Sequence, residues 1–166
     1  MSGPPTVSVM IAVRNGAASL PRTLDSLRAQ TFDDFELILI DDGSTDRTWE
    51  VIEGLEWRRL RAHRNTAQRG EAAALDQALE WASGRYVAHH GAGDTSTPDR
   101  LEKQVGLLER RDDLAGVGAS LDWVDADGNV LHHIAVPSGY KTLARWVQEH
   151  DAWAVCLAHR ATLLRR

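Results

Sequence analysis

Short runs of apolar residues alternate along this chain with segments whose apolar residues recur at helical spacing. The first run, VSVMIAV, is almost continuously apolar, which is typical of a strand that is buried on both faces. We expect strands at residues 7–13, 35–40, 57–63 and 86–90, and helices at about 20–29, 46–54, 69–83 and 98–111. This order predicts an α/β class protein with a mainly parallel sheet flanked by helices.

The pattern changes after residue 114. Runs at 117–124 and 130–136 flank the sequence Asp125-Ala126-Asp127-Gly128-Asn129, and this predicts a β-hairpin near the C-terminal part of the chain. A helix at 140–150, a strand at 153–157 and a further helix at 160–166 are expected to follow. We expect one domain over residues 1–166, truncated at its C-terminus because the sequence ends inside an element.

Composition narrows the class of protein. With 166 residues, 43% hydrophobic and 26% charged, the chain fits one ordinary globular domain. The net charge of -5 and the absence of a dense basic stripe argue against a nucleic-acid partner. The cluster Arg58, Arg59, Arg61 and Arg64 is interpreted as the exposed side of a strand. A single cysteine, Cys156, and no apolar run of roughly 20 residues indicate a cytoplasmic chain without a membrane segment in this sequence.

Polar clusters follow three of the expected strands, at residues 14–16, 41–45 and 91–97. Ligands of parallel sheets lie outside the carboxyl ends of the strands, so these clusters are expected to share one edge. A carboxylate such as Asp42 at a strand end can accept the imide N–H of a base or a ribose hydroxyl. The alternative is that Asp41 and Asp42 cap the turn and the helix that follows.

Four segments in this order resemble the family 2 glycosyltransferases. They are VSVMIAVRN, QTFDDFELILIDDGSTD, SGRYV and TPDRLEKQV. The resemblance implies an A-type, Rossmann-like fold that binds a nucleoside-diphosphate sugar, with a UDP-sugar favoured. It also implies transfer of the sugar to a hydroxyl acceptor with inversion, in the synthesis of cell-surface polysaccharide or glycoconjugates. The alternative function is a noncatalytic nucleotide-sugar-binding or scaffold domain.

The resemblance assigns roles to several residues. Asp42 matches the position that contacts the base, Asn15 holds the loop beneath the base, and Arg14 replaces a common aromatic residue, where it stacks on the base or pairs with a phosphate. Arg69 is a candidate diphosphate clamp, although a solvated arginine at a helix start is an equal alternative. The complete candidate set for nucleotide-sugar binding is Ala12, Arg14, Asn15, Asp41, Asp42, Arg69 and Asp94.

The expected metal site departs from the family pattern. Its two D-x-D aspartates fall on Gly91 and Gly93, which leaves Asp94 as the acidic residue. Three alternatives follow: Asp94 holds Mg or Mn with His89 or His90; the enzyme uses Arg14, Arg69 or backbone N–H groups without metal; or the domain has lost catalysis. The usual general base follows the last expected elements and lies outside this sequence.

Three weaker signals remain. The literal D-x-D at 125–127 is interpreted as a turn. Gly91-Ala92-Gly93 lacks the third glycine of a dinucleotide fingerprint. Trp123 and Trp153 are candidates for lining a sugar site because tryptophan stacks on sugar rings.

Overall fold

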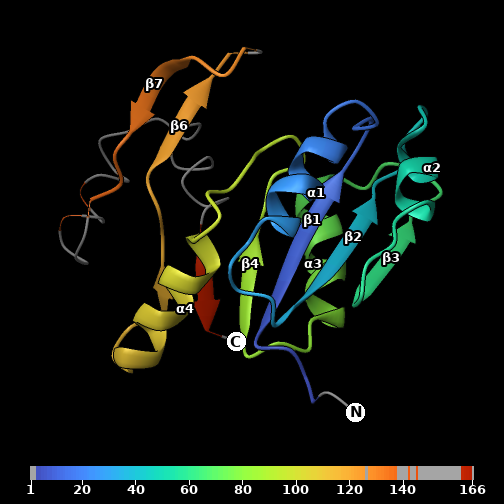
Figure 1. Cartoon of the computed structure of the whole chain (residues 1–166). Helices are drawn as coiled ribbons and strands as arrows, with labels where there is room; N and C mark the ends of the chain where they lie inside the picture. The colour runs from blue at the N-terminus through green and yellow to red at the C-terminus, as the bar shows by residue number, and fades with distance from the viewer. Residues whose placement is uncertain (1–2, 126, 138–141, 143–144, 146–161, 166) are drawn as a thin grey trace.

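The computed structural model describes residues 3–125, 127–137, 142, 145 and 162–165. Within this part the main sheet has six strands in the order β3-β2-β1-β4-β8-β5. The strands β1 (Val7–Val13), β2 (Phe35–Asp41), β3 (Leu60–Arg64) and β4 (Tyr86–His89) are parallel. The predicted α/β class with a mainly parallel sheet is therefore confirmed (Figure 1).

Helices cover both faces of the sheet. The helices α1 (Leu20–Arg28), α2 (Thr48–Glu53) and α4 (Arg100–Arg110) pack on one face, and α3 (Glu71–Trp81) packs on the other (Figure 1). Two apolar clusters result, one on each side of the sheet.

Strand β1 shows why its sequence is apolar at almost every position. Val9 and Ile11 join the cluster beneath α1 and α4, whereas Met10 joins the cluster beneath α3. Because successive side chains of a strand point to opposite faces, a central strand covered on both sides needs apolar residues in both registers.

The predicted hairpin is also confirmed. Strands β6 (Leu121–Val124) and β7 (Val130–Ile134) form a separate two-stranded antiparallel sheet, which projects away from the main sheet in Figure 1. In its turn, the carboxylate Oδ1 of Asp125 accepts the backbone N–H groups of Asp127 (3.0 Å) and Asn129 (2.8 Å). The literal D-x-D sequence therefore belongs to a turn, as predicted.

Two predictions near the C-terminus are wrong. The expected strand 117–124 is divided between β5 (Gly116–Val117), in the main sheet, and β6, in the hairpin. Residues within the expected helix 160–166 form β8 (Leu163–Arg165), which is antiparallel to both β4 and β5. Burial of Leu163 and backbone pairing on both sides outweigh the helical tendency of so short a segment.

Several predictions lie wholly or largely outside the described residues. They concern the helix at 140–150, the strand at 153–157, Trp153 and Cys156. None of the helices in the described part of the chain has the length and the apolar composition of a membrane span.

Candidate nucleotide-sugar site

A cavity of about 230 Å³ lies at the carboxyl ends of β1, β2 and β4, at the upper edge of the sheet in Figure 1. Its lining residues come from these strand ends and from the loop and helix start near α3. They are Ala12, Val13, Arg14, Asp42, Gln68, Glu71 and Ala92. The edge predicted from the polar clusters therefore contains a cavity, and three of the candidate residues line it, namely Ala12, Arg14 and Asp42.

Asp42 connects the end of β2 to the loop that precedes α3. Its Oδ1 accepts the backbone N–H of Arg69 (2.8 Å) and the Nδ2 of Asn65 (3.0 Å), while its Oδ2 accepts the N–H of Gly70 (2.8 Å). Each carboxylate oxygen can accept two hydrogen bonds, so Oδ2 retains capacity for a further donor.

The carboxyl group of Asp42 is held in its ionised form. Burial acts to raise its pKa, because only 3% of the residue is exposed. The hydrogen bonds from Arg69, Asn65 and Gly70 outweigh burial, and the charge of Arg14 acts in the same direction. The pKa of Asp42 consequently lies below its usual value, and the cavity contains a carboxylate that is an acceptor only.

Asn15 joins the loop after β1 to the loop after β2. Its backbone is in the left-handed region (φ 53°), which asparagine tolerates better than most residues. Its N–H donates to Ser44 Oγ (2.9 Å), and its Oδ1 accepts the N–H of Thr45 (2.9 Å). Asn15 is thus placed to fix the shape of the loop that begins at Arg14.

Asp41 and Arg69 lie beside the cavity and are not among its lining residues. Asp41 is fully buried, accepts the N–H of Ser44 (2.9 Å) and lies 3.5 Å from Arg64 Nε. Arg69 is exposed and precedes α3, which begins at Glu71 rather than at residue 69 as expected. The backbone N–H of Arg69 contacts the site through its hydrogen bond to Asp42.

The loop after β4 is attached to α1 by the hydroxyl groups of Thr23 and Ser26, and Ser26 Oγ accepts the N–H of Ser96 (3.2 Å). Thr23 Oγ1 accepts the N–H of Gly93 (2.8 Å) and donates to the carbonyl of Asp94 (2.8 Å). Gly93 has φ 102°, a conformation that L-residues with a side chain rarely adopt. The backbone of the loop is therefore suited to glycine at the position where the family pattern has an aspartate.

The buried side chains of His90 and Arg100 form a hydrogen-bonded chain with the half-buried Ser96 of this loop. Nδ1 of His90 lies 3.0 Å from the carbonyl oxygen of Gly91, so Nδ1 carries the hydrogen. Nε2 then accepts the hydroxyl hydrogen of Ser96 (2.9 Å), and Ser96 Oγ accepts Nη1 of Arg100 (3.0 Å). Both ring nitrogens of His90 are occupied by these contacts, which leaves no lone pair for a metal.

His89 points to the other face of the sheet, as expected for adjacent residues at a strand end. Its Nε2 lies 3.6 Å from Oε1 of Glu71, the first residue of α3. Glu71 is half-exposed and lines the cavity, whereas His89 is buried next to it and is not a lining residue.

The residues of this edge do not fit a D-x-D metal site. Gly91 and Gly93 have no side-chain oxygen, and the carboxylate of Asp94 interacts with the buried guanidinium of Arg100. Burial lowers the pKa of Arg100 to about 10, and the charge of Asp94 opposes that effect. In the described part of the chain, no three His, Cys, Asp or Glu residues lie together as ligands for a metal ion.

Sequence reasoning missed Gln68 and Glu71 as residues of the cavity. Gln68 belongs to a loop in which the sequence contains no motif, and Glu71 was assigned no role in binding. The signal that could have found them is the Gly70 that precedes α3, because it brings the loop back toward Asp42.

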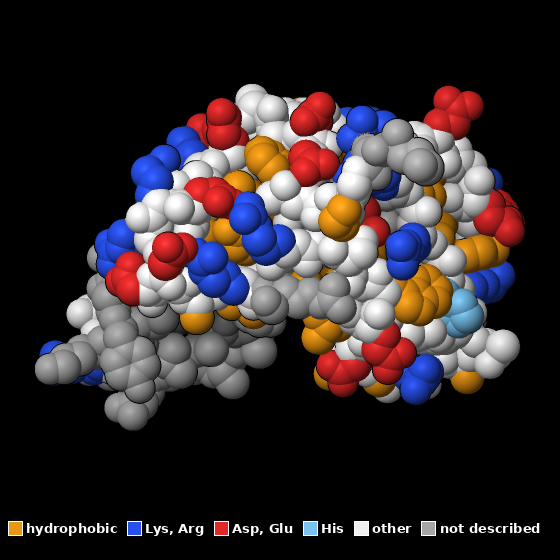
Figure 2. All heavy atoms as spheres, turned by 90° about the horizontal axis from the view of Figure 1, so that it is seen from below, with side chains coloured by type: hydrophobic (Ala, Val, Ile, Leu, Met, Phe, Trp, Pro, Cys, Tyr) orange, Lys and Arg blue, Asp and Glu red, His pale blue; other side chains and the backbone are white. Residues whose placement is uncertain are grey.

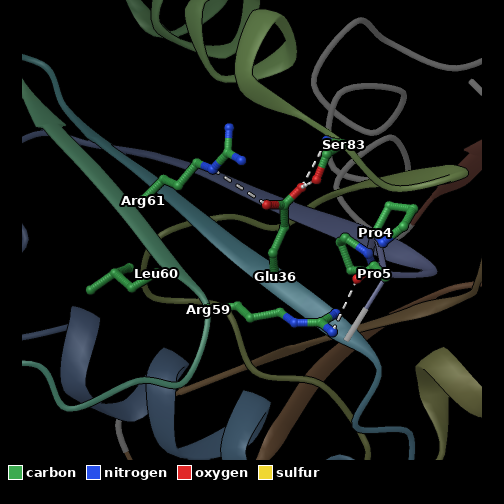
Figure 3. A pocket seen from close by; sticks show the side chains of 8 residues that line it. Pro4, Pro5, Glu36, Arg59, Leu60, Arg61 and Ser83 are labelled. Atoms are coloured by element: carbon green, nitrogen blue, oxygen red, sulfur yellow. Dashed lines mark hydrogen bonds and ion pairs between the residues drawn. The ribbon is translucent and has the colours of Figure 1, made fainter. Parts of the chain in front are cut away.

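A second, larger cavity of about 510 Å³ lies at the opposite, amino-terminal edge of the sheet (Figure 3). Figure 2 shows this side of the molecule, where Lys and Arg are interspersed with Asp and Glu. Inside the cavity, Oε1 of Glu36 accepts the hydroxyl groups of Ser8 (2.6 Å) and Ser83 (2.8 Å), and Oε2 lies 3.6 Å from Arg61. Because these charged groups are paired with one another, they stabilise the sheet edge rather than form a candidate ligand site.

Comparison with known proteins agrees with this architecture. The sequence profile of glycosyl transferase family 2 matches residues 8–165. The chain is 33% identical over 103 residues to the UDP-Glc:alpha-D-GlcNAc-diphosphoundecaprenol beta-1,3-glucosyltransferase WfaP of Escherichia coli, covering 62% of this chain and 41% of that protein. It is 39% identical over 94 residues to a PGL/p-HBAD biosynthesis glycosyltransferase of Mycobacterium bovis, covering 55% and 36% respectively.

Among solved structures, the mannosyltransferase PcManGT of Pyrobaculum calidifontis, in complex with GDP-Man and Mn2+, superposes with a TM-score of 0.64. It is 26% identical to this chain, and the superposed part covers 71% of this chain and 36% of the PcManGT chain. The chain spans less than half the length of each of these three proteins. Because the family profile extends over nearly all of its length, the chain belongs to glycosyl transferase family 2.

Proposed function

We propose that this chain is the donor-binding part of a glycosyltransferase and that the cavity beside Asp42 receives a nucleoside-diphosphate sugar, with a UDP-sugar as the preferred donor. The observation that carries the proposal is the lining of this cavity by Ala12, Arg14 and Asp42 at the carboxyl ends of the parallel strands. In a member of this family, that is the edge at which a nucleotide is expected.

The proposed contacts follow from the chemistry of the lining. Asp42 accepts the imide N–H of a uracil-type base through the free capacity of Oδ2, and Asn15 fixes the loop beneath the base. Arg14 faces the diphosphate, because a guanidinium pairs well with phosphate oxygens. Asp41 and Arg69 are proposed to support the site without touching the donor. Asp41 holds the turn at Ser44, and the backbone N–H of Arg69 holds the carboxylate of Asp42 in place.

In the complete enzyme, the sugar is transferred to a hydroxyl acceptor with inversion at the anomeric carbon. The acceptor oxygen attacks the face opposite the diphosphate and loses its proton to a general base. Cell-surface polysaccharide or glycoconjugate synthesis is the proposed setting, because WfaP acts on a diphosphoundecaprenol-linked sugar. Residues 1–166 are proposed to form one cytoplasmic domain of the longer protein.

Calorimetric titration of the chain with UDP tests the donor site. We expect a dissociation constant in the micromolar range, equivalent to about -8 kcal/mol. Asp42→Ala should abolish the heat of binding. Since Asp42 also holds the loop before α3, Ala12→Phe is the second variant, because a phenyl ring there fills the cavity and leaves Asp42 in place.

The comparison nucleotide is ADP, which has the same diphosphate but whose adenine lacks an imide N–H. Tighter binding of UDP than of ADP, lost in both variants, supports the proposal. Equal weak heats for both nucleotides in the native chain would instead favour a noncatalytic domain, which the replacement of the D-x-D aspartates by Gly91 and Gly93 makes the second candidate.

A further inference from the structure

We infer that the donor diphosphate is bound in this chain without a divalent cation and that the guanidinium of Arg14 balances its charge. The inference rests on the proposed donor site. It concerns the part of that site where the chain departs from the D-x-D pattern, and PcManGT, a similar structure, contains Mn2+.

The loop after β4 is unsuited to a hard cation in both composition and backbone. Mg and Mn require several oxygen ligands, and the glycines at 91 and 93 supply none from a side chain. Gly93 cannot simply be exchanged for an aspartate, since its φ of 102° favours glycine and its N–H is fixed by Thr23. The conformation of the loop is therefore built around the glycine.

The remaining acidic residue of the loop, Asp94, affects the charge of a neighbouring buried cation. Burial lowers the pKa of Arg100, and the charge of Asp94 opposes that effect. The guanidinium of Arg100 donates to Ser96 and Gln104. A metal cation bound by Asp94 would offset the favourable charge that this carboxylate supplies to Arg100. One carboxylate also falls short of the several oxygen ligands that Mg and Mn require.

A positively charged side chain, that of Arg14, lines the cavity and is exposed to solvent. Arg14 is the only cation among the lining residues, all of which lie in the described part of the chain, and its side chain is exposed. Of the two lining carboxylates, Asp42 opposes an anion less than its charge suggests, because it accepts three N–H donors.

Calorimetric titration with UDP in two buffers, one with EDTA and one with Mn, tests the inference. We expect the two dissociation constants to agree within about twofold, and Arg14→Gln to weaken UDP binding about tenfold or more in EDTA. Arg58→Gln is the matched control, because Arg58 is exposed at the amino-terminal edge, just before β3, and away from the cavity. Its binding of UDP should equal that of the native chain.

Uridine identifies the group that Arg14 contacts. Since uridine has no phosphate, Arg14→Gln should leave its affinity unchanged if the guanidinium serves the diphosphate. An equal loss for uridine and UDP would show that Arg14 stacks on the base, and it would overturn the assignment of Arg14.

The remaining outcomes separate the inference from the proposed function. Binding of UDP that appears only with Mn overturns the inference and leaves the donor site in place. No heat with UDP in either buffer overturns the proposed function, and the inference falls with it.

Discussion

The carboxylate of Asp42, directly after β2, accepts the backbone N–H of Gly70, directly before α3, at 2.8 Å. This contact brings the start of a helix to the end of a strand that is distant in sequence. Gly70 has φ 97°, which glycine adopts without a steric penalty, and the N-terminus of a helix favours a nearby anion. The side chain of Asp42 therefore has two roles: it holds the loop before α3 in place, and it lines the cavity.

Replacing Asp42 by asparagine should destabilise the fold even though the shape of the side chain is kept. Its amide group would direct N–H hydrogens at the N–H donors of Arg69, Gly70 or Asn65, and at least one hydrogen bond would be lost. We expect a decrease of about 1–3 kcal/mol in the free energy of unfolding, measured with urea.

The control for this variant is Asp33→Asn, at an exposed position before β2. It should change the free energy of unfolding by less than about 0.5 kcal/mol. Equal stabilities of the two variants would show that the Asp42 network does not hold the loop before α3.

Glu36 gives the chain a defined dependence of stability on pH. Burial acts to raise the pKa of Glu36, but the hydrogen bonds from Ser8 and Ser83 and the charge of Arg61 outweigh it, so the pKa lies below 4.5. A depressed pKa in the folded state stabilises the fold above the pKa of the unfolded chain. This contribution is lost as pH falls through the folded-state value.

The variant Glu36→Gln should therefore be less stable than the native chain at about pH 7, by on the order of 1–3 kcal/mol. The difference should shrink when urea unfolding is repeated at pH values below about 4.5, since Glu36 is then protonated in the unfolded chain. Glu80→Gln, on the exposed side of α3, is the control and should change the free energy of unfolding by less than about 0.5 kcal/mol at pH 7. A constant difference for Glu36→Gln would contradict the assigned pKa.

Local patterns were sufficient where neighbours in sequence decide the structure. The apolar run at 7–13 and the turn at 125–129 predicted β1 and the hairpin because burial on both faces and turn chemistry are encoded locally. Strand β8 was missed because Leu163 obtains its burial and its pairing from β4 and β5, which are distant in sequence.

The same limit explains the outcome at the site. Asp42 and Arg14 were found as candidates because they follow apolar strands directly. Gln68 and Glu71 were not, since their loop is brought to the cavity by contacts between residues distant in sequence, such as the hydrogen bonds of Asp42. The electrostatic effect of Asp94 on Arg100 was equally unreadable, because it depends on how the loop folds against the helix that follows it.

Ser96 should matter for stability although it is a small polar residue in a loop. Its hydroxyl lies between His90 and Arg100, so Ser96→Ala leaves a buried imidazole nitrogen and a buried guanidinium N–H without this partner. We expect a loss of about 1–3 kcal/mol in the free energy of unfolding. By thermal denaturation, a change of 1 kcal/mol in a chain of this size lowers Tm by roughly 2–4 °C.

Thr95→Ala is the control for this loop, because the neighbouring side chain is exposed. Its Tm should match that of the native chain within about 1 °C. If both variants lower Tm equally, the effect arises from the loop backbone and not from the chain of contacts through Ser96.

Gly93 connects the stability of the fold with the departure from the D-x-D pattern. A Cβ at this position would lie 3.4 Å from the Cβ of Ser19, and the φ of 102° is strained for any residue with a side chain. Gly93→Ala should therefore cost about 1–3 kcal/mol in the free energy of unfolding. Gly118→Ala is the matched control, since its Cβ would approach Thr162 Oγ1 no closer than 3.8 Å and should be tolerated. If Gly93→Ala is as stable as this control, the backbone tolerates a side chain there, and the conformation of the loop does not exclude an aspartate.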